Sequence, residues 1–136
     1  MTNVSTVPRF EVKANPQLMD VKWGDVIYVD FGKGIGSEQG GVRPAVVIQN
    51  NKGNNHSPCT LVAPMTSSEE KPYLPTHIIV YPTKDSGLKK ISTIIFEQTR
   101  AIDKSRILSK IGHLDAESLT NRIENSISIA FSKNFA

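Results

Sequence analysis

Short β-prone runs separated by Gly, Pro, Asn and Ser residues restrict the fold of this chain more than any other feature of its sequence. The runs are four to seven residues long and rich in Val, Ile and Thr, as strands usually are. They cover Asp25–Phe31, Ala45–Gln49, Thr60–Pro64, His77–Val80 and Ser92–Glu97. Five short strands at this spacing predict a mainly β fold, either a compact barrel or a curled sheet.

Two of these runs lack the alternation of a strand with one solvated face. Residues 45–49 read AVVIQ and residues 78–80 read IIV, so each is almost continuously apolar. Such runs predict strands that are covered on both faces, by other layers of the chain or by a second subunit.

Two helix starts are expected toward the C-terminus. Asp103 and Asp115 are N-cap candidates, and each lies between apolar residues that can pair across the first turn, Ile102 with Ile107 and Leu114 with Leu119. The second helix is expected to place one apolar face on the barrel, formed by Leu119, Ile123, Ile127, Ala130 and Phe131.

The length of 136 residues suits one domain with a substantial core. Residues 1–20 are polar, contain Pro8 and Pro16 and have no sustained period, so they are predicted to be a flexible N-terminal extension. The domain is therefore expected to span residues 21–136.

Composition narrows the classes of function without choosing among them. No apolar run approaches the roughly 20 residues that span a bilayer, and no signal-peptide pattern is present, so we expect a cytoplasmic protein with no membrane partner. The lone Cys59 and three scattered histidines lack metal-site spacing, so no metal or cofactor is expected. The net charge of +3 is compatible with a polyanionic ligand but does not establish one.

The segment between the first two runs, GKGIGSEQGGVRP, holds glycines at 32, 34, 36, 40 and 41. Glycines permit close approach of the backbone to a ligand, at an entropic cost. The segment is therefore either a functional lid or clamp, or a tolerated flexible hairpin.

Arg43 and Thr66 are candidates for chemistry at strand ends. Pro44 holds Arg43 extended at the start of a strand, where its planar fork can bind a phosphate, although an ordinary surface ion pair is the alternative. Thr66 ends the third run, where its hydroxyl can donate to an oxyanion or simply satisfy turn groups. Neighbouring Glu97 and Gln98 should face opposite sides of a strand, with Glu97 either paired with an arginine or free to read a base.

Other hydrolase patterns are absent from the sequence. There is no GxSxG elbow, no Walker loop, and no Cys/His/Asn nucleophile set. These observations argue against acyl-transfer and nucleotide-hydrolysing classes.

Taken together, several segments resemble the MazF/PemK family of toxin ribonucleases. The matching stretches, in order over about residues 21–115, are VKWGDVIYVDF, GSEQGGVRPAVVIQN, the GNNHSP turn, PMTS, LPTHI and IIFEQTRAIDKSRI. The chain departs from the family pattern in two places. The extension 1–20 has no counterpart in the family, and Pro64-Met65 stands before the threonine, where the family usually has smaller or aliphatic residues.

The resemblance implies a CcdB/PemK-type SH3-like barrel, a homodimer, a single-stranded RNA substrate and a MazE-like antitoxin. It also implies that Arg43 and Thr66 are the catalytic pair in attack by the RNA 2′-hydroxyl on its own 3′-phosphate. That reaction leaves a cyclic phosphate and a 5′-hydroxyl without a metal. We expect Glu38 to accept or orient the 2′-hydroxyl proton, and the substrate-binding candidates that read base edges are Ser37, Glu38, Gln39, His77 and Gln98.

Two other functions remain open on the sequence alone. CcdB-like proteins of the same barrel family poison DNA gyrase and have no nuclease activity. An SH3-like module without catalysis that binds only a peptide is the third possibility.

Overall fold

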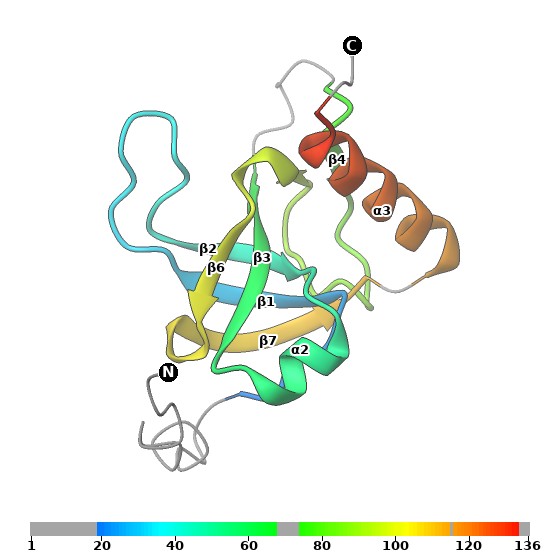
Figure 1. Cartoon of the computed structure of the whole chain (residues 1–136). Coiled ribbons are helices and arrows are strands. Elements are labelled where there is room, and N and C mark those ends of the chain that lie inside the picture. Colours follow the sequence, from blue (N-terminus) through cyan, green and yellow to red (C-terminus); the bar gives the residue numbers. More distant parts are fainter. Residues whose placement is uncertain (1–18, 68–73, 115, 134–136) are drawn as a thin grey trace.

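The computed structural model describes residues 19–67, 74–114 and 116–133. Within these ranges seven strands, two α-helices and two short 3₁₀ helices (η) follow one another (Figure 1). In chain order they are β1 (Asp25–Asp30), β2 (Val42–Val47), α2 (Asn51–His56), β3 (Cys59–Thr66), β4 (His77–Val80), β5 (Ser92–Ile95), η2 (Phe96–Gln98), β6 (Arg100–Asp103), η3 (Lys104–Arg106), β7 (Ile107–His113) and α3 (Glu117–Phe131).

All strand pairings are antiparallel, and the sheet order is β4-β5-β3-β2-β1-β7, with β6 also paired to β3. In Figure 1, β1, β2 and β7 run across the view, whereas β3 and β6 cross them at a steep angle. The two outer strands, β4 and β7, do not pair with each other within the described ranges. The predicted mainly β fold with a C-terminal helix is confirmed, and its barrel is an open one.

Strand β3 is the centre of the sheet. One of its edges pairs with β2, and its other edge pairs first with β6 and then with β5. Between the β5 and β6 pairings the register slips by three residues, which is the length of η2. The three residues of η2, Phe96–Gln98, therefore leave the ladder as a short turn instead of continuing as strand.

The core consists of two clusters on opposite sides of β1 and β2. Val26 and Val46 belong to the cluster that packs under α3, whereas Ile27, Ala45 and Val47 belong to the other. All five are fully buried. For the AVVIQ run, the predicted cover on both faces is confirmed at Ala45, Val46 and Val47, where layers of the same chain provide it, whereas Ile48 and Gln49 are only partly buried.

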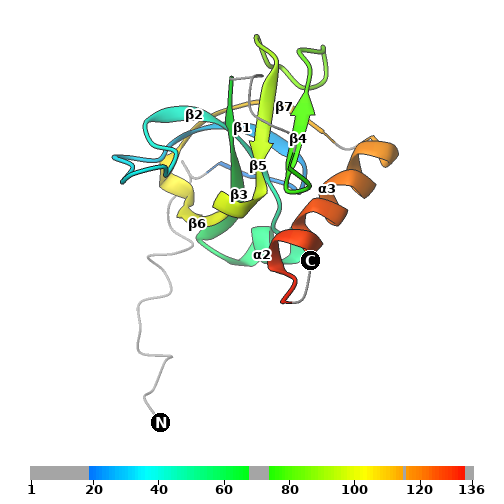
Figure 2. The same ribbon diagram turned by 90° about the horizontal axis from the view of Figure 1, so that it is seen from above.

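Helix α3 lies against one side of the sheet, next to β4 (Figure 2). Ile123 is fully buried, and Leu119, Ile127 and Ala130 pack against the first cluster, as the helical spacing predicts. The hydroxyl of Ser126 donates to the carbonyl of Pro75 at 3.0 Å. Phe131 was expected on this face, but it is 70% exposed because it is the last residue of the helix.

The helix expected after Asp103 is wrong. Asp103 does cap, accepting from the backbone N–H of Ser105 at 2.8 Å, but it caps only the single turn η3. From Ile107 the chain becomes β7, whose backbone pairs along β1. The edge of β1 would otherwise bury backbone groups without partners, and this tertiary demand outweighs the local capping signal.

The remaining predictions concern the bounds of the strands, the IIV run and the N-cap of the last helix. All five predicted runs form strands, although β5 ends at Ile95 instead of Glu97, and β6, β7 and α2 were not predicted. Ile79 is 42% exposed, so the described part of this chain does not cover both faces of the IIV run, and cover of β4 by a second subunit stays a prediction. Asp115 and most of the extension 1–20 lie outside the described residues, and the N-cap position of α3 is Ala116.

Candidate active site

Backbone hydrogen bonds hold the two limbs of the β1–β2 loop together. Gly41 N donates to Gly32 O at 2.7 Å, and Phe31 N donates to Gly41 O at 3.0 Å, so the outgoing and returning limbs lie side by side. A Cβ atom on Gly34 would meet the backbone of Glu38, which only glycine avoids. The loop is thus a built structure whose tip is exposed, with Ile35 78% accessible.

Arg43 connects this loop to the central strand. Its Nε donates to Gly40 O at 2.9 Å, and its Nη1 donates to Met65 O at 3.2 Å. The Nη2 group has no protein acceptor among the described residues, so part of the planar fork remains available. Partial burial lowers the pKa of the guanidinium from its ordinary value. The side chain is anchored by backbone carbonyls, and no carboxylate of the described residues pairs with it.

Thr66 ends β3 and lies beside Arg43. The β2–β3 register aligns Ala45 with Pro64, and continuing it by two residues places Arg43 opposite Thr66. On its other side Thr66 pairs with Thr93 of β5. Two residues far apart in the sequence thus meet because β2 begins where β3 ends.

Arg43 and Thr66 line the same open cavity, of about 380 Å³. Lys89 and Lys90 line it as well, from the segment that leads into β5, and Ser67 extends it beyond Thr66. Three cationic side chains and the Thr66 hydroxyl in one lining make this cavity suited to a phosphate group. Lys89 and Lys90 were not among the residues predicted from the sequence, although a Lys-Lys pair just before a strand is a visible signal.

A second open cavity, of about 630 Å³, lies between the loop and η2. Glu38 and Gln39 line it from the loop, and Glu97 and Gln98 line it from η2. Three cations that sequence reasoning missed also line it: Lys33, Arg100 and Arg106. The Arg100 guanidinium lies over the Phe31 ring, 5.6 Å from its centroid. Three of the five predicted base-reading residues, Glu38, Gln39 and Gln98, therefore line this cavity and not the one lined by Arg43 and Thr66.

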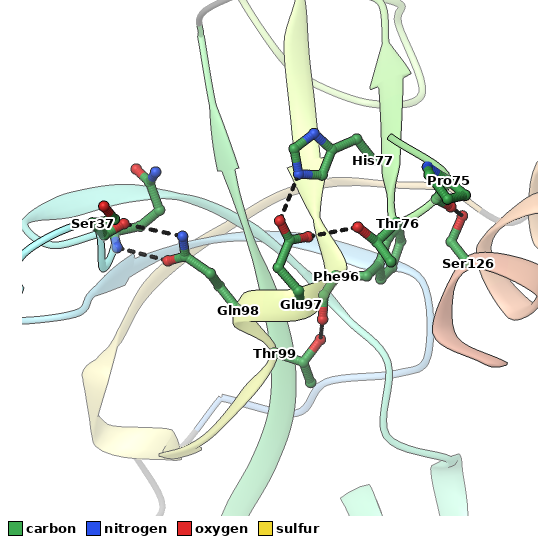
Figure 3. A network of polar contacts seen from close by, with 10 residues as sticks. Ser37, Pro75, Thr76, His77, Phe96, Glu97, Gln98, Thr99 and Ser126 are labelled. Carbon is green, nitrogen blue, oxygen red and sulfur yellow. Dashed lines mark hydrogen bonds and ion pairs between the residues drawn. The ribbon is translucent and has the colours of Figure 1, made fainter. Parts of the chain in front are cut away.

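Gln98 contacts the loop directly (Figure 3). Its Oε1 accepts from Gln39 N at 2.8 Å, and its Nε2 donates to Ser37 O at 3.1 Å. Because the register slips at η2, this side chain projects away from the ladder toward the loop. Ser37 itself is exposed, and its carbonyl is the atom that Gln98 engages.

Glu97 forms an ion pair, which is one of the two alternatives that the sequence left open, and its partner is His77 instead of an arginine. Its Oε2 lies 2.8 Å from His77 Nε2, and its Oε1 accepts from the Thr76 hydroxyl at 2.9 Å (Figure 3). Partial burial acts to raise the pKa of Glu97. Hydrogen bonds from its own backbone, His77 and Thr76, together with the His77 charge, outweigh burial and hold this pKa below its ordinary value.

The side chain of His77 contacts Glu97 and is largely enclosed. It is 9% exposed, and its Nδ1 atom is buried with no hydrogen-bond partner among the residues that the structure describes. Nε2 is held by Glu97. Of the five predicted base-reading residues, His77 and Ser37 line neither of the two cavities described above.

Within 19–67, 74–114 and 116–133, no three His, Cys, Asp or Glu side chains come together as metal ligands would. None of the helices placed by the structure has the length and apolar character to cross a membrane.

Comparison with known proteins gives close relatives in sequence. The chain is 45% identical over 112 residues to "Endoribonuclease EndoA" of Bacillus subtilis (strain 168), covering 82% of this chain and 95% of that protein. It is 40% identical over 114 residues to "Endoribonuclease MazF" of Staphylococcus epidermidis, covering 84% of this chain and 93% of that protein.

Solved structures show the same fold at lower identity. A mycobacterial endoribonuclease in complex with its cognate antitoxin matches with a TM-score of 0.68 at 18% identity, covering 85% of this chain and 99% of that chain. MazF from Deinococcus radiodurans matches with a TM-score of 0.66 at 19% identity, covering 81% and 94%. The sequence pattern of the PemK-like, MazF-like toxins of type II toxin–antitoxin systems matches residues 22–131, and the chain belongs to this family.

Proposed function

We propose that this chain is a toxin endoribonuclease that cuts single-stranded RNA at specific sequences without a metal ion and is neutralised by a cognate antitoxin. The observation that carries the proposal is one cavity whose lining includes Arg43, Thr66, Lys89 and Lys90. Family membership and the relatives named endoribonucleases support it.

The proposed chemistry uses a nucleophile supplied by the substrate. The RNA 2′-oxygen attacks the adjacent phosphorus and loses its proton, the bond from phosphorus to the 5′-oxygen breaks, and that oxygen gains a proton. The products are a 2′,3′-cyclic phosphate and a 5′-hydroxyl. The protein then has only to align the sugar and phosphate, stabilise negative charge and manage two protons.

Arg43 and Thr66 are the proposed catalytic pair. With Nε and Nη1 anchored on backbone carbonyls, the guanidinium is fixed before substrate arrives, and Nη2 is left for a phosphate oxygen. Preorganised donors of this kind stabilise developing charge without rearranging during the reaction. The Thr66 hydroxyl supplies a second donor from the opposite strand.

Glu38 is the proposed acceptor, or orienting group, for the 2′-hydroxyl proton. One of its carboxylate oxygens accepts from Ile35 N at 2.9 Å, which holds the side chain against the loop. Its other oxygen has no protein partner among the described residues. Near-full turnover of Glu38→Gln would remove this assignment.

The larger cavity is the proposed site for flanking nucleotides. It combines polar groups of Glu38 and Gln39 that can read bases with cations from Lys33 and Arg106. Single-stranded RNA is discriminated in this way, by hydrogen bonds to unstacked bases and charge contacts to the backbone. Ser37 and His77 remain proposed contacts at its margin.

The proposed setting is a cytoplasmic homodimer with a MazE-like antitoxin. Solved relatives in complex with antitoxins, including MazE-MazF of Deinococcus radiodurans, support the partner. An antitoxin segment in the basic cavities would exclude RNA by direct competition. Co-purification of a small partner encoded beside the toxin, together with loss of cleavage when it is added, tests this part.

The deciding experiment incubates the purified protein with a long unstructured RNA in excess EDTA and maps the fragment ends. Arg43→Ala is compared with Arg122→Ala, a matched arginine on α3 outside both cavities. We expect sequence-specific cuts with cyclic phosphate ends in the wild type and Arg122→Ala, and none in Arg43→Ala. Intact RNA throughout, with inhibition of gyrase supercoiling, would instead support a gyrase poison.

A further inference from the structure

Gln98 makes a two-point contact with the β1–β2 loop across about sixty residues of sequence. We propose that Gln98 is a positioning residue, which holds this loop and, through it, Arg43 in the arrangement required for cleavage. The sequence analysis assigned Gln98 to base reading. The structure instead shows each end of its amide group engaged by the loop backbone, with Oε1 on Gln39 N and Nε2 on Ser37 O.

These two bonds flank a single residue. Ser37 O and Gln39 N lie on either side of Glu38, so the amide of Gln98 binds the loop as a neighbouring strand would. The carboxylate of Glu38 is held in turn by Ile35 N. The Glu38 side chain is therefore held by Ile35 N, and the backbone on either side of Glu38 is held by Gln98 of η2.

The contact continues to Arg43. Gln39, whose N–H is bound by Gln98, is followed by Gly40, whose carbonyl accepts from Arg43 Nε at 2.9 Å. Arg43 Nη1 then donates to Met65 O, next to Thr66. A continuous polar path thus runs from η2 through the loop to the proposed catalytic pair, and movement of Gln39 would move the carbonyl that anchors Arg43.

The contact requires a side chain that donates and accepts at once. An amide does both, whereas an ionised carboxylate accepts only and alanine does neither. A protonated carboxylic acid again offers one donor and one acceptor. The variant Gln98→Glu therefore reproduces the pattern of hydrogen bonds only at a pH low enough to protonate it.

The first test measures hydrogen exchange at the loop amides of the RNA-free protein and does not depend on activity. In Gln98→Ala we expect Gln39 N–H to exchange about five- to tenfold faster, as loss of one hydrogen bond implies. Gly41 N–H, bound to Gly32 O at 2.7 Å, is the internal control and should be unchanged. Gln39→Ala keeps the backbone N–H and should keep its protection. Unchanged exchange at position 39 in Gln98→Ala overturns the proposal.

The second test is kinetic and rests on the proposed function. Gln98→Ala should lower kcat about tenfold with little change in KM and the same cleavage sequence. Gln98→Glu should recover activity relative to wild type as the pH is lowered from 8 to 5. A changed cleavage sequence with normal exchange at Gln39 would assign Gln98 to base reading and reject positioning. If no variant or wild type cleaves RNA, the proposed function fails, and the exchange result still decides whether Gln98 holds the loop.

Discussion

The guanidinium of Arg43 donates to the main-chain carbonyl of Met65 at 3.2 Å and so fixes the start of β2 to the end of β3. A second bond, to Gly40 O, ties the same side chain to the loop. The fork is consequently oriented before any ligand binds. The catalytic proposal therefore depends on geometry as well as charge.

Replacing Arg43 by lysine keeps the charge and removes the fork. Because an ammonium cannot anchor on two carbonyls and still present a planar pair of donors, we expect Arg43→Lys to lose about 10²- to 10³-fold in kcat. Single-turnover cleavage of a defined RNA measures the effect, with thermal unfolding as a check on folding. Activity within threefold of wild type would show that charge alone suffices.

Adding one methyl group at Gly34 should open the loop. Its Cβ would overlap the backbone of Glu38, and the backbone cannot move aside without displacing the returning limb. We expect Gly34→Ala to lower the free energy of unfolding by about 1–3 kcal/mol. We also expect a lower cleavage rate per folded molecule, beyond any loss of folded protein. Urea denaturation and cleavage assays on the same preparation measure both. Wild-type behaviour in both would show that the two limbs are not packed as described.

The Glu97–His77 pair predicts a pH dependence of stability. The folded pKa of Glu97 lies below its ordinary value of 4.5, so its contribution is present above that value and is lost as pH falls through the folded pKa. We expect Glu97→Gln to be less stable than wild type near pH 6, with the difference shrinking below about pH 4. Thermal unfolding across this range checks the sign, and a difference that grows on acidification would contradict it. Because Glu97 is 44% exposed, the effect should be small.

Asn54 should be a strong determinant of stability outside the site. It is 1% exposed and accepts from the Thr60 hydroxyl at 2.6 Å, while its amide donates to Gln49 O at 2.9 Å. Asn54→Ala leaves these buried partners unsatisfied, so we expect a loss of about 1–3 kcal/mol in the free energy of unfolding. Chemical denaturation measures it. Cleavage per folded molecule should stay near wild type, because neither cavity includes Asn54.

Hydrophobic patterns in the sequence predicted secondary structure well where no distant segment competed with the local preference. The run His77–Val80 forms β4 with those bounds, and the spacing of Leu119, Ile123 and Ile127 predicted the buried face of α3. The prediction failed at Asp103, where a genuine cap precedes a strand. There the chain forms a strand because the edge of β1 needs backbone hydrogen-bond partners. The sequence around Asp103 contains no pattern that indicates this requirement of a distant strand.

The candidate site shows the same division. Sequence alone determined which residue types could do the chemistry: an arginine set extended by Pro44, a threonine at a strand end, and a glycine-rich loop between two strands. Only the tertiary structure decided which of them meet. The β2–β3 register places Arg43 opposite Thr66, and the three-residue slip at η2 aims Gln98 at the loop and Glu97 at His77. Register and bulges arise from pairing between segments far apart in the chain, so their consequences for side-chain direction cannot be found in any one of those segments.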